Sequence, residues 1–199
     1  MMINRRRVYG GKSLPYDAEI EYLECSGTQY IITDVLTEKG LVTEIDFKYT
    51  SFVNNSALFG SWERGGIIYQ CTLLNNKWYF GSYSTSESNV GWYEGSPNTD
   101  RHLIKLDGNG SLYQDGHLLA TIGVSEKTST RNIYIFLRNG IERNMASIKC
   151  YGVRCLKNDV LIADFIPVRV GNVGYMYDKV TKQLFGNAGT GSFILGPDV

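Results

Sequence analysis

The stretch Arg101–Ile122, RHLIKLDGNGSLYQDGHLLATI, places two turn signals between three short β-type segments. Asp115-Gly116 is a two-residue turn signal, because a type I′ turn needs positive φ at both central positions. Residues 107–110, DGNG, supply a second and looser turn from the same φ-tolerant residue types. Three strands joined this tightly have to lie antiparallel, so the stretch predicts a β-meander.

The β pattern continues along the rest of the chain. In residues 41–50, Ile45, Phe47 and Tyr49 share one face and polar residues take the other, as expected of a strand with one buried face. No helix of normal length is predicted. Many short strands at close spacing, each with one polar and one apolar face, favour an all-β sandwich of two antiparallel sheets. Further strands are expected at 57–61, 67–73, 77–83, 101–106, 111–114, 117–122, 132–138, 146–155, 159–166, 175–178 and 183–185.

The composition excludes several classes of protein. Twenty acidic residues balance twenty basic ones, so nothing favours nucleic acid or an anionic membrane as a partner. No stretch approaches the length of a transmembrane helix. The four cysteines show neither metal-ligand spacing nor a dense disulfide pattern, so we expect buried, reduced thiols. The start of the chain has a basic run with no apolar segment behind it, so no secretory signal is expected: the protein either stays in the cell where it is made or leaves by a route other than signal-peptide export.

Residues 1–18 are predicted to form a basic N-terminal arm, because they lack periodicity and contain Arg5, Arg6 and Arg7. These arginines are either part of a solvated leader or an anchor that docks onto an acidic partner surface. No linker is visible after residue 18, so residues 19–199 are expected to form a single β-sandwich domain.

Three segments together resemble a known family. They are Glu21–Ile31, EYLECSGTQYI; the strand–turn–strand unit LYQDGHLLA; and residues 173–193, VGYMYDKVTKQLFGNAGTGSF. This set is similar to the laminin-G/concanavalin A-like jelly-roll domains found in proteins of gut bacteria and their bacteriophages. Two small departures are the extra Tyr175 before the MYD motif and Cys25 at a position where serine or threonine is more usual.

The resemblance implies two opposed antiparallel sheets, one of them concave. Relatives are associated with glycan binding or with virion appendages, although the fold alone fixes neither role. Through these relatives, the resemblance implies a lectin-like adhesion module on the surface or an appendage of a phage particle. The expected partners are a polysaccharide or surface glycoconjugate and other virion proteins, with no membrane and no nucleic acid. Appendage proteins are commonly multimeric, so a homo-oligomer is a further expectation.

One strand suggests an enzyme. Glu44-Ile-Asp-Phe-Lys48 resembles the catalytic strand of laminarinase-type glycoside hydrolases, in which alternating carboxylates project into a cleft. Retaining hydrolysis needs a nucleophile and an acid/base carboxyl about 5–5.5 Å apart. Here Lys48 holds the position that completes the carboxylate series, and neither it nor Tyr49 supplies a carboxylic acid. We therefore expect a solvent-facing strand with paired charges and no enzymatic activity.

The aromatic residues between positions 62 and 93 are the better candidates for a site. All three tryptophans fall within this segment, together with several asparagines and serines. Aromatic rings stack on the apolar face of a sugar, while amides and hydroxyls meet its hydroxyl groups. The alternative is that these rings belong to the core, as one face of residues 77–83 must. The candidate glycan-binding residues are Trp62, Tyr83, Asn89, Trp92 and Tyr93, the last two of them in a loop-like stretch.

No metal or cofactor is expected. Calcium at the rim is the nearest alternative, with loop candidates at Asp34, Asn98, Asp100 and Asp107. No D-x-D-x-D-G run concentrates the six to eight oxygens that calcium prefers. The sequence thus favours a non-catalytic recognition module that binds a glycan on a phage virion. The alternatives are a structural or decorating virion protein without a ligand and, more remotely, a glycoside hydrolase.

Overall fold

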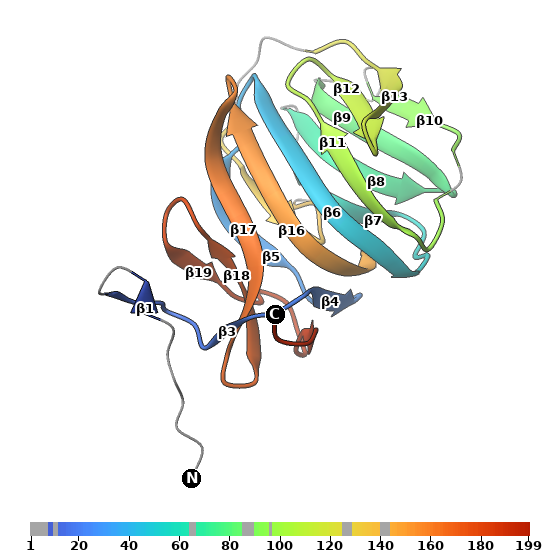
Figure 1. Ribbon diagram of the computed structural model, residues 1–199. Coiled ribbons are helices and arrows are strands. Elements are labelled where there is room, and N and C mark those ends of the chain that lie inside the picture. The colour runs from blue at the N-terminus through green and yellow to red at the C-terminus, as the bar shows by residue number, and fades with distance from the viewer. Residues whose placement is uncertain are drawn as a thin grey trace.

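The computed structural model describes residues 8–9, 12–63, 67–84, 90–95, 97–124, 129–139 and 144–199. This part of the chain forms two main β-sheets and contains no helix (Figure 1). It consequently offers no helix that is long and apolar enough to cross a bilayer. The predicted all-β class and two-sheet antiparallel sandwich of jelly-roll type are confirmed.

The larger sheet has eleven strands. Its main path, in spatial order, is β13 (His117–Thr121), β12 (Ser111–Gln114), β11 (Arg101–Leu106), β6 (Leu41–Ser51), β16 (Ser147–Lys157), β17 (Val160–Val170), β18 (Val173–Asp178) and β19 (Gln183–Phe185). Three short strands are attached to it: β3 (Ala18–Glu19) on β17, β4 (Leu23–Ser26) on β16, and β20 (Ile194–Leu195) on β4.

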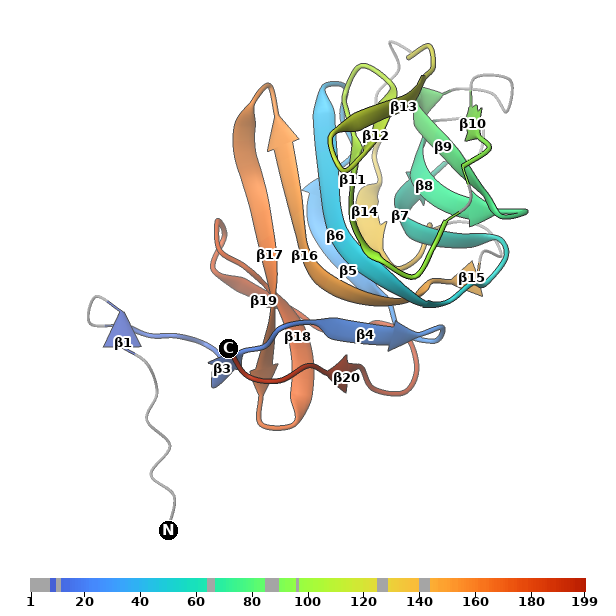
Figure 2. The same cartoon turned by 45° about the vertical axis from the view of Figure 1, so that its right-hand side comes forward.

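The smaller sheet has seven strands. In spatial order they are β10 (Gly91–Tyr93), β9 (Lys77–Ser84), β8 (Ile68–Leu74), β7 (Ser56–Trp62), β14 (Asn132–Ile135) and β5 (Ile31–Leu36), with β15 (Asn144–Met145) running parallel to β7. A separate ribbon of β1 (Val8–Tyr9) and β2 (Lys12–Ser13) lies apart from both sheets (Figures 1 and 2).

The core lies between the two sheets and joins them through aromatic contacts. Phe47 and Tyr49 of β6 pack against Trp78 of β9, with ring centroids 6.3 and 6.2 Å apart. Such contacts add to the large apolar area that aromatic side chains bury. All four cysteines are free and buried, as predicted, and burial raises the pKa of Cys150 and of Cys155 to about 12.

The local predictions for β6 and for the meander are confirmed. The inward face of β6 is buried at Ile45, Phe47 and Tyr49. Strands β11, β12 and β13 pair antiparallel. Asp115 and Gly116 have φ of +52° and +81°, which is the backbone conformation that the turn requires.

The packed part of the chain begins inside the range expected to form an arm. Tyr16 is buried against Val168 and Tyr177, and its ring centroid lies 4.9 Å from that of Tyr177. Ala18 then opens β3 and pairs with Arg169. Residues from Leu14 onward therefore contribute to packing against the larger sheet.

The smaller sheet departs from the expected pattern of one polar and one apolar face per strand. In β7 and β8, residues on both faces are buried. The face turned away from the core carries polar residues, among them the fully buried Gln70 and Thr72. Arg138 lies on Gln70, with Nη1 donating to its Oε1 over 2.6 Å. This contact, between residues 68 positions apart, is invisible to strand periodicity.

Removing the hydroxyl group is expected to change the free energy of unfolding in opposite directions at two core tyrosines, Tyr49 and Tyr69. The Tyr49 hydroxyl is buried and has no hydrogen-bond partner among the described residues, whereas the Tyr69 hydroxyl donates to Thr43 Oγ1 over 2.9 Å. An unpaired buried polar group costs about 1–3 kcal/mol, and a typical hydrogen bond contributes about 1 kcal/mol. Tyr49→Phe should raise the free energy of unfolding by about 1 kcal/mol, and Tyr69→Phe should lower it by about as much. Urea denaturation of both variants is the measurement, and a destabilised Tyr49→Phe would contradict the expectation.

Candidate functional site

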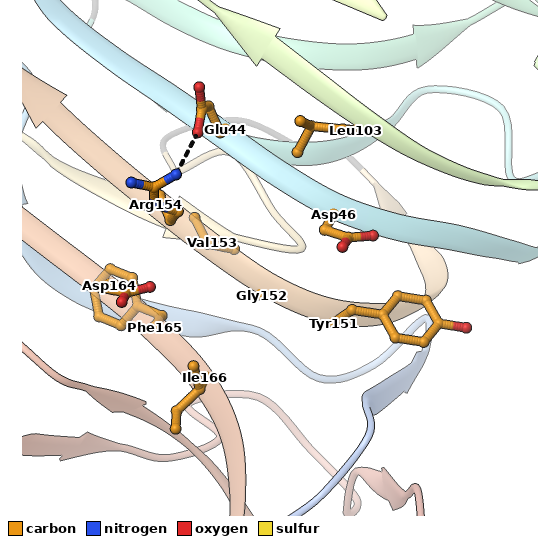
Figure 3. Close-up of a pocket in the computed structure, with 10 residues that line it drawn as sticks. All are labelled: Glu44, Asp46, Leu103, Tyr151, Gly152, Val153, Arg154, Asp164, Phe165 and Ile166. Carbon is orange, nitrogen blue, oxygen red and sulfur yellow. Dashed lines mark hydrogen bonds and ion pairs between the residues drawn. The ribbon is translucent and has the colours of Figure 1, made fainter. Parts of the chain in front are cut away.

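A hollow of about 240 Å³ opens on the face of the larger sheet that points away from the core. It lies across the neighbouring strands β11, β6, β16 and β17, which Figures 1 and 2 show side by side. Figure 3 shows its side chains arranged around Gly152, so we call it the Gly152 hollow. Its lining comprises Glu44, Asp46, Leu103, Tyr151, Gly152, Val153, Arg154, Asp164, Phe165 and Ile166.

The floor of the Gly152 hollow is built by an irregularity in β16. The pairing of β16 with β6 shifts register between Cys150 and Gly152, and Gly152 then faces Asp46. A β-bulge inserts one extra residue and re-aims side chains, here placing Tyr151 at the rim. Gly152 contributes no side chain to the floor, and a Cβ at this position would lie 3.3 Å from the Phe165 carbonyl oxygen, closer than an ordinary van der Waals contact.

Three carboxylates and their cations surround the floor. Arg101 forms two hydrogen bonds with Asp46, over 2.8 and 2.7 Å. Glu44 and Arg154 approach to 3.5 Å, and Lys179 approaches Asp164 to 2.7 Å. Glu44, Arg154 and Asp164 lie next to one another across three neighbouring strands. This follows from the register, because Arg154 of β16 is paired with Glu44 of β6 on one side and with Asp164 of β17 on the other.

Tyr151 is held in place by its neighbours. The Arg101 guanidinium lies 3.7 Å from the centroid of its ring, and Tyr22 meets it edge-on at 5.8 Å. Burial raises the pKa of Tyr151, against the opposing effect of Arg101, so the phenol stays a neutral hydroxyl that is able to donate a hydrogen bond. Arg101 therefore positions two parts of the rim at once, namely Asp46 and Tyr151.

The position of Asp164 depends on a buried carboxylate behind it. Asp178 Oδ1 accepts the Asp164 backbone N–H over 2.8 Å and that of Val180 over 2.9 Å, while Oδ2 accepts the Thr181 hydroxyl over 2.7 Å. Burial by itself raises the pKa of Asp178, but these hydrogen bonds outweigh it and hold the pKa below its ordinary value. A charged Asp178 thus ties β17 to the loop after β18.

The lining combines the three properties that a sugar requires of its site. Carboxylates accept hydrogen bonds from hydroxyl groups, and guanidinium and phenol groups donate to them. Leu103, which is 42% exposed, and Ile166 lie on opposite sides of the hollow (Figure 3) and provide apolar surface for the C–H face of a ring. The exposed lining of the Gly152 hollow thus consists mainly of polar and charged side chains, with a smaller apolar part.

Two of the sequence-predicted aromatic residues lie elsewhere, on the outward face of the smaller sheet. Trp92 is 47% exposed, and its ring centroid lies 4.6 Å from that of Tyr79, its partner in register. Trp62 is half-buried at the end of β7, with the Arg138 guanidinium 5.7 Å from its ring centroid. We call Trp62, Tyr79 and Trp92 the aromatic face. It is separate from the Gly152 hollow, which belongs to the other sheet.

Tyr93, another of the predicted residues, is not part of the aromatic face. Tyr93 is half-buried against the core and lines a different hollow of about 230 Å³ near Asp115. The expectation that Trp92 and Tyr93 lie in a loop is wrong, because Gly91–Tyr93 pair with β9 as a short edge strand. The Tyr83 side chain, Asn89 and the arginines Arg5, Arg6 and Arg7 lie outside the described residues, so their roles stay predictions.

Strand β6, whose Glu44–Lys48 segment resembles the catalytic strand of glycoside hydrolases, contributes to the site. Glu44 and Asp46 both line the Gly152 hollow. The residues that sequence analysis missed are Arg101, Tyr151, Arg154 and Asp164. They come from three other strands, β11, β16 and β17, and no signal in the sequence shows that β16 lies beside β6.

The residues considered for calcium do not converge. Asn98 Oδ1 contacts His102 and the backbone of Asp100, and Asp107 Oδ1 accepts N–H groups of its own turn. Asp34 lies on β5, in the other sheet. Within the ranges that the structure describes, no group of three or more His, Cys, Asp or Glu residues is placed to hold a metal ion.

Comparison with known proteins gives a likeness in structure but none in sequence. No protein-family model and no curated protein sequence matches this chain. A crystal structure from Bacteroides ovatus ATCC 8483, described as a "putative carbohydrate binding protein", is similar over 89% of this chain with a TM-score of 0.64 and 11% identity. The match spans 60% of that protein's length. At this identity the likeness shows that the two proteins share a fold.

Proposed function

We propose that this protein is a non-catalytic carbohydrate-binding module and that the Gly152 hollow takes a sugar unit of its glycan. The observation that carries the proposal is the hollow itself, in which carboxylate, guanidinium, phenol and apolar groups surround a floor without a side chain. The shared fold with a protein described as carbohydrate-binding supports the same function.

The charges favour binding over cleavage. Glycoside hydrolysis by a carboxylate pair requires one carboxyl group to hold a proton that it delivers to the leaving oxygen. Asp46, Glu44 and Asp164 instead each lie in an ion pair, with Arg101, Arg154 and Lys179 respectively. Position 48 also holds a lysine, whereas the motif of the laminarinase-type hydrolases continues with a carboxylate at this position.

The proposal is tested by Arg154→Ala with the purified protein on a glycan array, followed by titration calorimetry with the best ligand. The Arg154 side chain is 54% exposed, so its removal should leave the fold intact while deleting a hydrogen-bond donor from the hollow. We expect binding to weaken at least tenfold, because a hydrogen bond to a charged group contributes about 1.5–3 kcal/mol. Arg131→Ala, an exposed arginine before β14, is the matched control and should bind normally. Single sites are weak, so the array should carry multivalent ligands.

The aromatic face is the competing location for the same function. Trp92→Ala should leave binding unchanged if the Gly152 hollow is the site. Loss of binding in Trp92→Ala, with Arg154→Ala unaffected, would assign the glycan to the aromatic face.

Hydrolysis is a second candidate function, favoured by the presence of Glu44, Asp46 and Asp164 around one hollow. It predicts release of reducing sugar from a bound polysaccharide and loss of that release in Glu44→Gln. Binding without any release of reducing sugar is the result expected of the proposed module.

A further inference from the structure

A second hollow of about 250 Å³ adjoins the first. It is lined by Glu19, Ile20, Glu21, Arg101, Tyr151, Ile166, Pro167 and Val199, and we call it the Glu21 hollow. Tyr151 and Ile166 line both hollows. Arg101, in the second lining, also hydrogen-bonds to Asp46 in the first. The two hollows are therefore neighbours on one face with a common wall.

We infer that the two hollows are adjacent subsites and that the ligand is a neutral oligosaccharide chain crossing Tyr151. This inference rests on the proposed function. Each hollow alone is smaller than the roughly 300–1,000 Å³ of a typical ligand site, whereas the two together fall within that range. A single sugar unit uses half of the available surface, and a chain of two or more units uses all of it.

The shared wall is suited to a chain that passes over it. The Tyr151 ring offers an apolar edge and a hydroxyl, and Ile166 adds aliphatic surface beside it. Arg101 is stacked on the Tyr151 ring at 3.7 Å and bonded to Asp46, which keeps the wall in one position. A rigid wall between subsites fixes the spacing of the sugar units that occupy them. Rigidity also favours binding, because less side-chain freedom is lost when the ligand binds.

The charge of the lining selects the class of sugar. Five carboxylates line the two hollows, against two guanidinium groups, Arg101 and Arg154, and the Lys179 ammonium that pairs with Asp164. Both guanidinium groups already contact carboxylates of the lining, at Asp46 and Glu44. The exposed Glu19 and Glu21 add negative charge in the second hollow. A chain of uronic acids would bring further carboxylates to this surface, where like charges repel, so a neutral chain is favoured.

The test measures affinity against chain length. Cello-, laminari-, malto- and manno-oligosaccharides of one to six units are titrated by calorimetry and, for the weakest, by NMR shift changes. For the series that binds, we expect affinity to rise at least tenfold from one unit to two or three and then to level off. Oligogalacturonates of equal length should bind at least tenfold more weakly than the neutral chain.

The variant Glu21→Ala isolates the second subsite. It removes an exposed side chain that lines only the Glu21 hollow. We expect it to abolish the gain in affinity from the second unit while leaving the affinity for one unit unchanged. Asp34→Ala, an exposed carboxylate on β5 in the other sheet, is the matched control and should behave as the wild type.

The outcomes distinguish failure of the inference, a second subsite for a neutral chain, from failure of the proposed function. A wild-type affinity that does not depend on chain length, or a Glu21→Ala variant that keeps the full gain, would overturn the second subsite while leaving the Gly152 hollow in place. Equal affinity for oligogalacturonates would overturn the neutral class. Binding that survives unchanged in Arg154→Ala would instead overturn the Gly152 hollow as the site, and a wild-type protein that binds no glycan on the array would overturn the proposed function itself.

Discussion

Replacing Gly152 with valine is expected to abolish measurable glycan binding while leaving the protein folded. Gly152 forms the floor of the hollow, and the two methyl groups of valine would occupy the space that the sugar needs. A loss beyond tenfold, or about 1.4 kcal/mol, is expected, because the steric conflict removes the contacts of the whole ring and not of one hydrogen bond. Calorimetry with the best oligosaccharide is the measurement.

The fold should tolerate Gly152→Val for two reasons. Gly152 does not have a positive φ, and valine is well suited to strands. The new Cβ would lie 3.3 Å from the Phe165 carbonyl oxygen, which requires a shift of only a few tenths of an ångström. Gly123→Val is the matched control, since a Cβ at Gly123 meets nothing within 4 Å. Unchanged binding by Gly152→Val, with a normal melting curve, would show that the hollow is not the site.

Removal of the Asp178 carboxylate is expected to be the most destabilising of the single changes considered. Asp178 is fully buried and accepts hydrogen bonds from three backbone N–H groups, those of Asp164, Val180 and Thr181, and from the Thr181 hydroxyl. Asp178→Ala leaves these part-buried donors without their acceptor, and a hydrogen bond to a charged group contributes about 1.5–3 kcal/mol. We expect the free energy of unfolding to fall by about 3 kcal/mol or more in urea denaturation. Asp34→Ala should unfold like the wild type.

The same carboxylate makes the fold sensitive to acid. The pKa of Asp178 is lowered in the folded protein, so its contribution to stability is fully present above the unfolded-state value of about 4. That contribution is lost as the pH falls through the folded-state pKa, because the carboxylate then has to take up a proton. Asp178→Asn lacks this titration. The stability difference between the wild type and Asp178→Asn should therefore narrow below about pH 4, and a difference that stays constant with pH would contradict this assignment.

Asp178 also connects stability with the site. Its Oδ1 holds the backbone N–H of Asp164, whose side chain lines the Gly152 hollow. A destabilised Asp178→Asn protein that still folds at neutral pH should therefore bind its glycan more weakly. The MYD motif at residues 176–178 thus bears on the site from a position outside its lining.

Local patterns were sufficient for the elements that local physics governs. The Asp115-Gly116 turn needs positive φ, and the residue types alone reveal it. The alternation in β6 separates Ile45 from Glu44 because successive side chains of a strand point to opposite faces. Local signals failed for Gly91–Tyr93, because an edge strand of three residues is too short to show alternation and is defined only by its pairing with β9.

The sequence by itself determined the all-β class, the meander, the buried face of β6 and the buried cysteines, because turn chemistry and a two-residue period act within a few positions. Only the tertiary structure decided where a ligand fits. Glu44 and Arg154 are 110 residues apart, and they meet because β16 pairs with β6 in one particular register. Periodicity states which way a side chain points but not which strand lies beside it. Tyr151 at the bulge and the adjacent Gly152 form the rim and the floor of a hollow only because β11, β6, β16 and β17 lie side by side in the folded sheet.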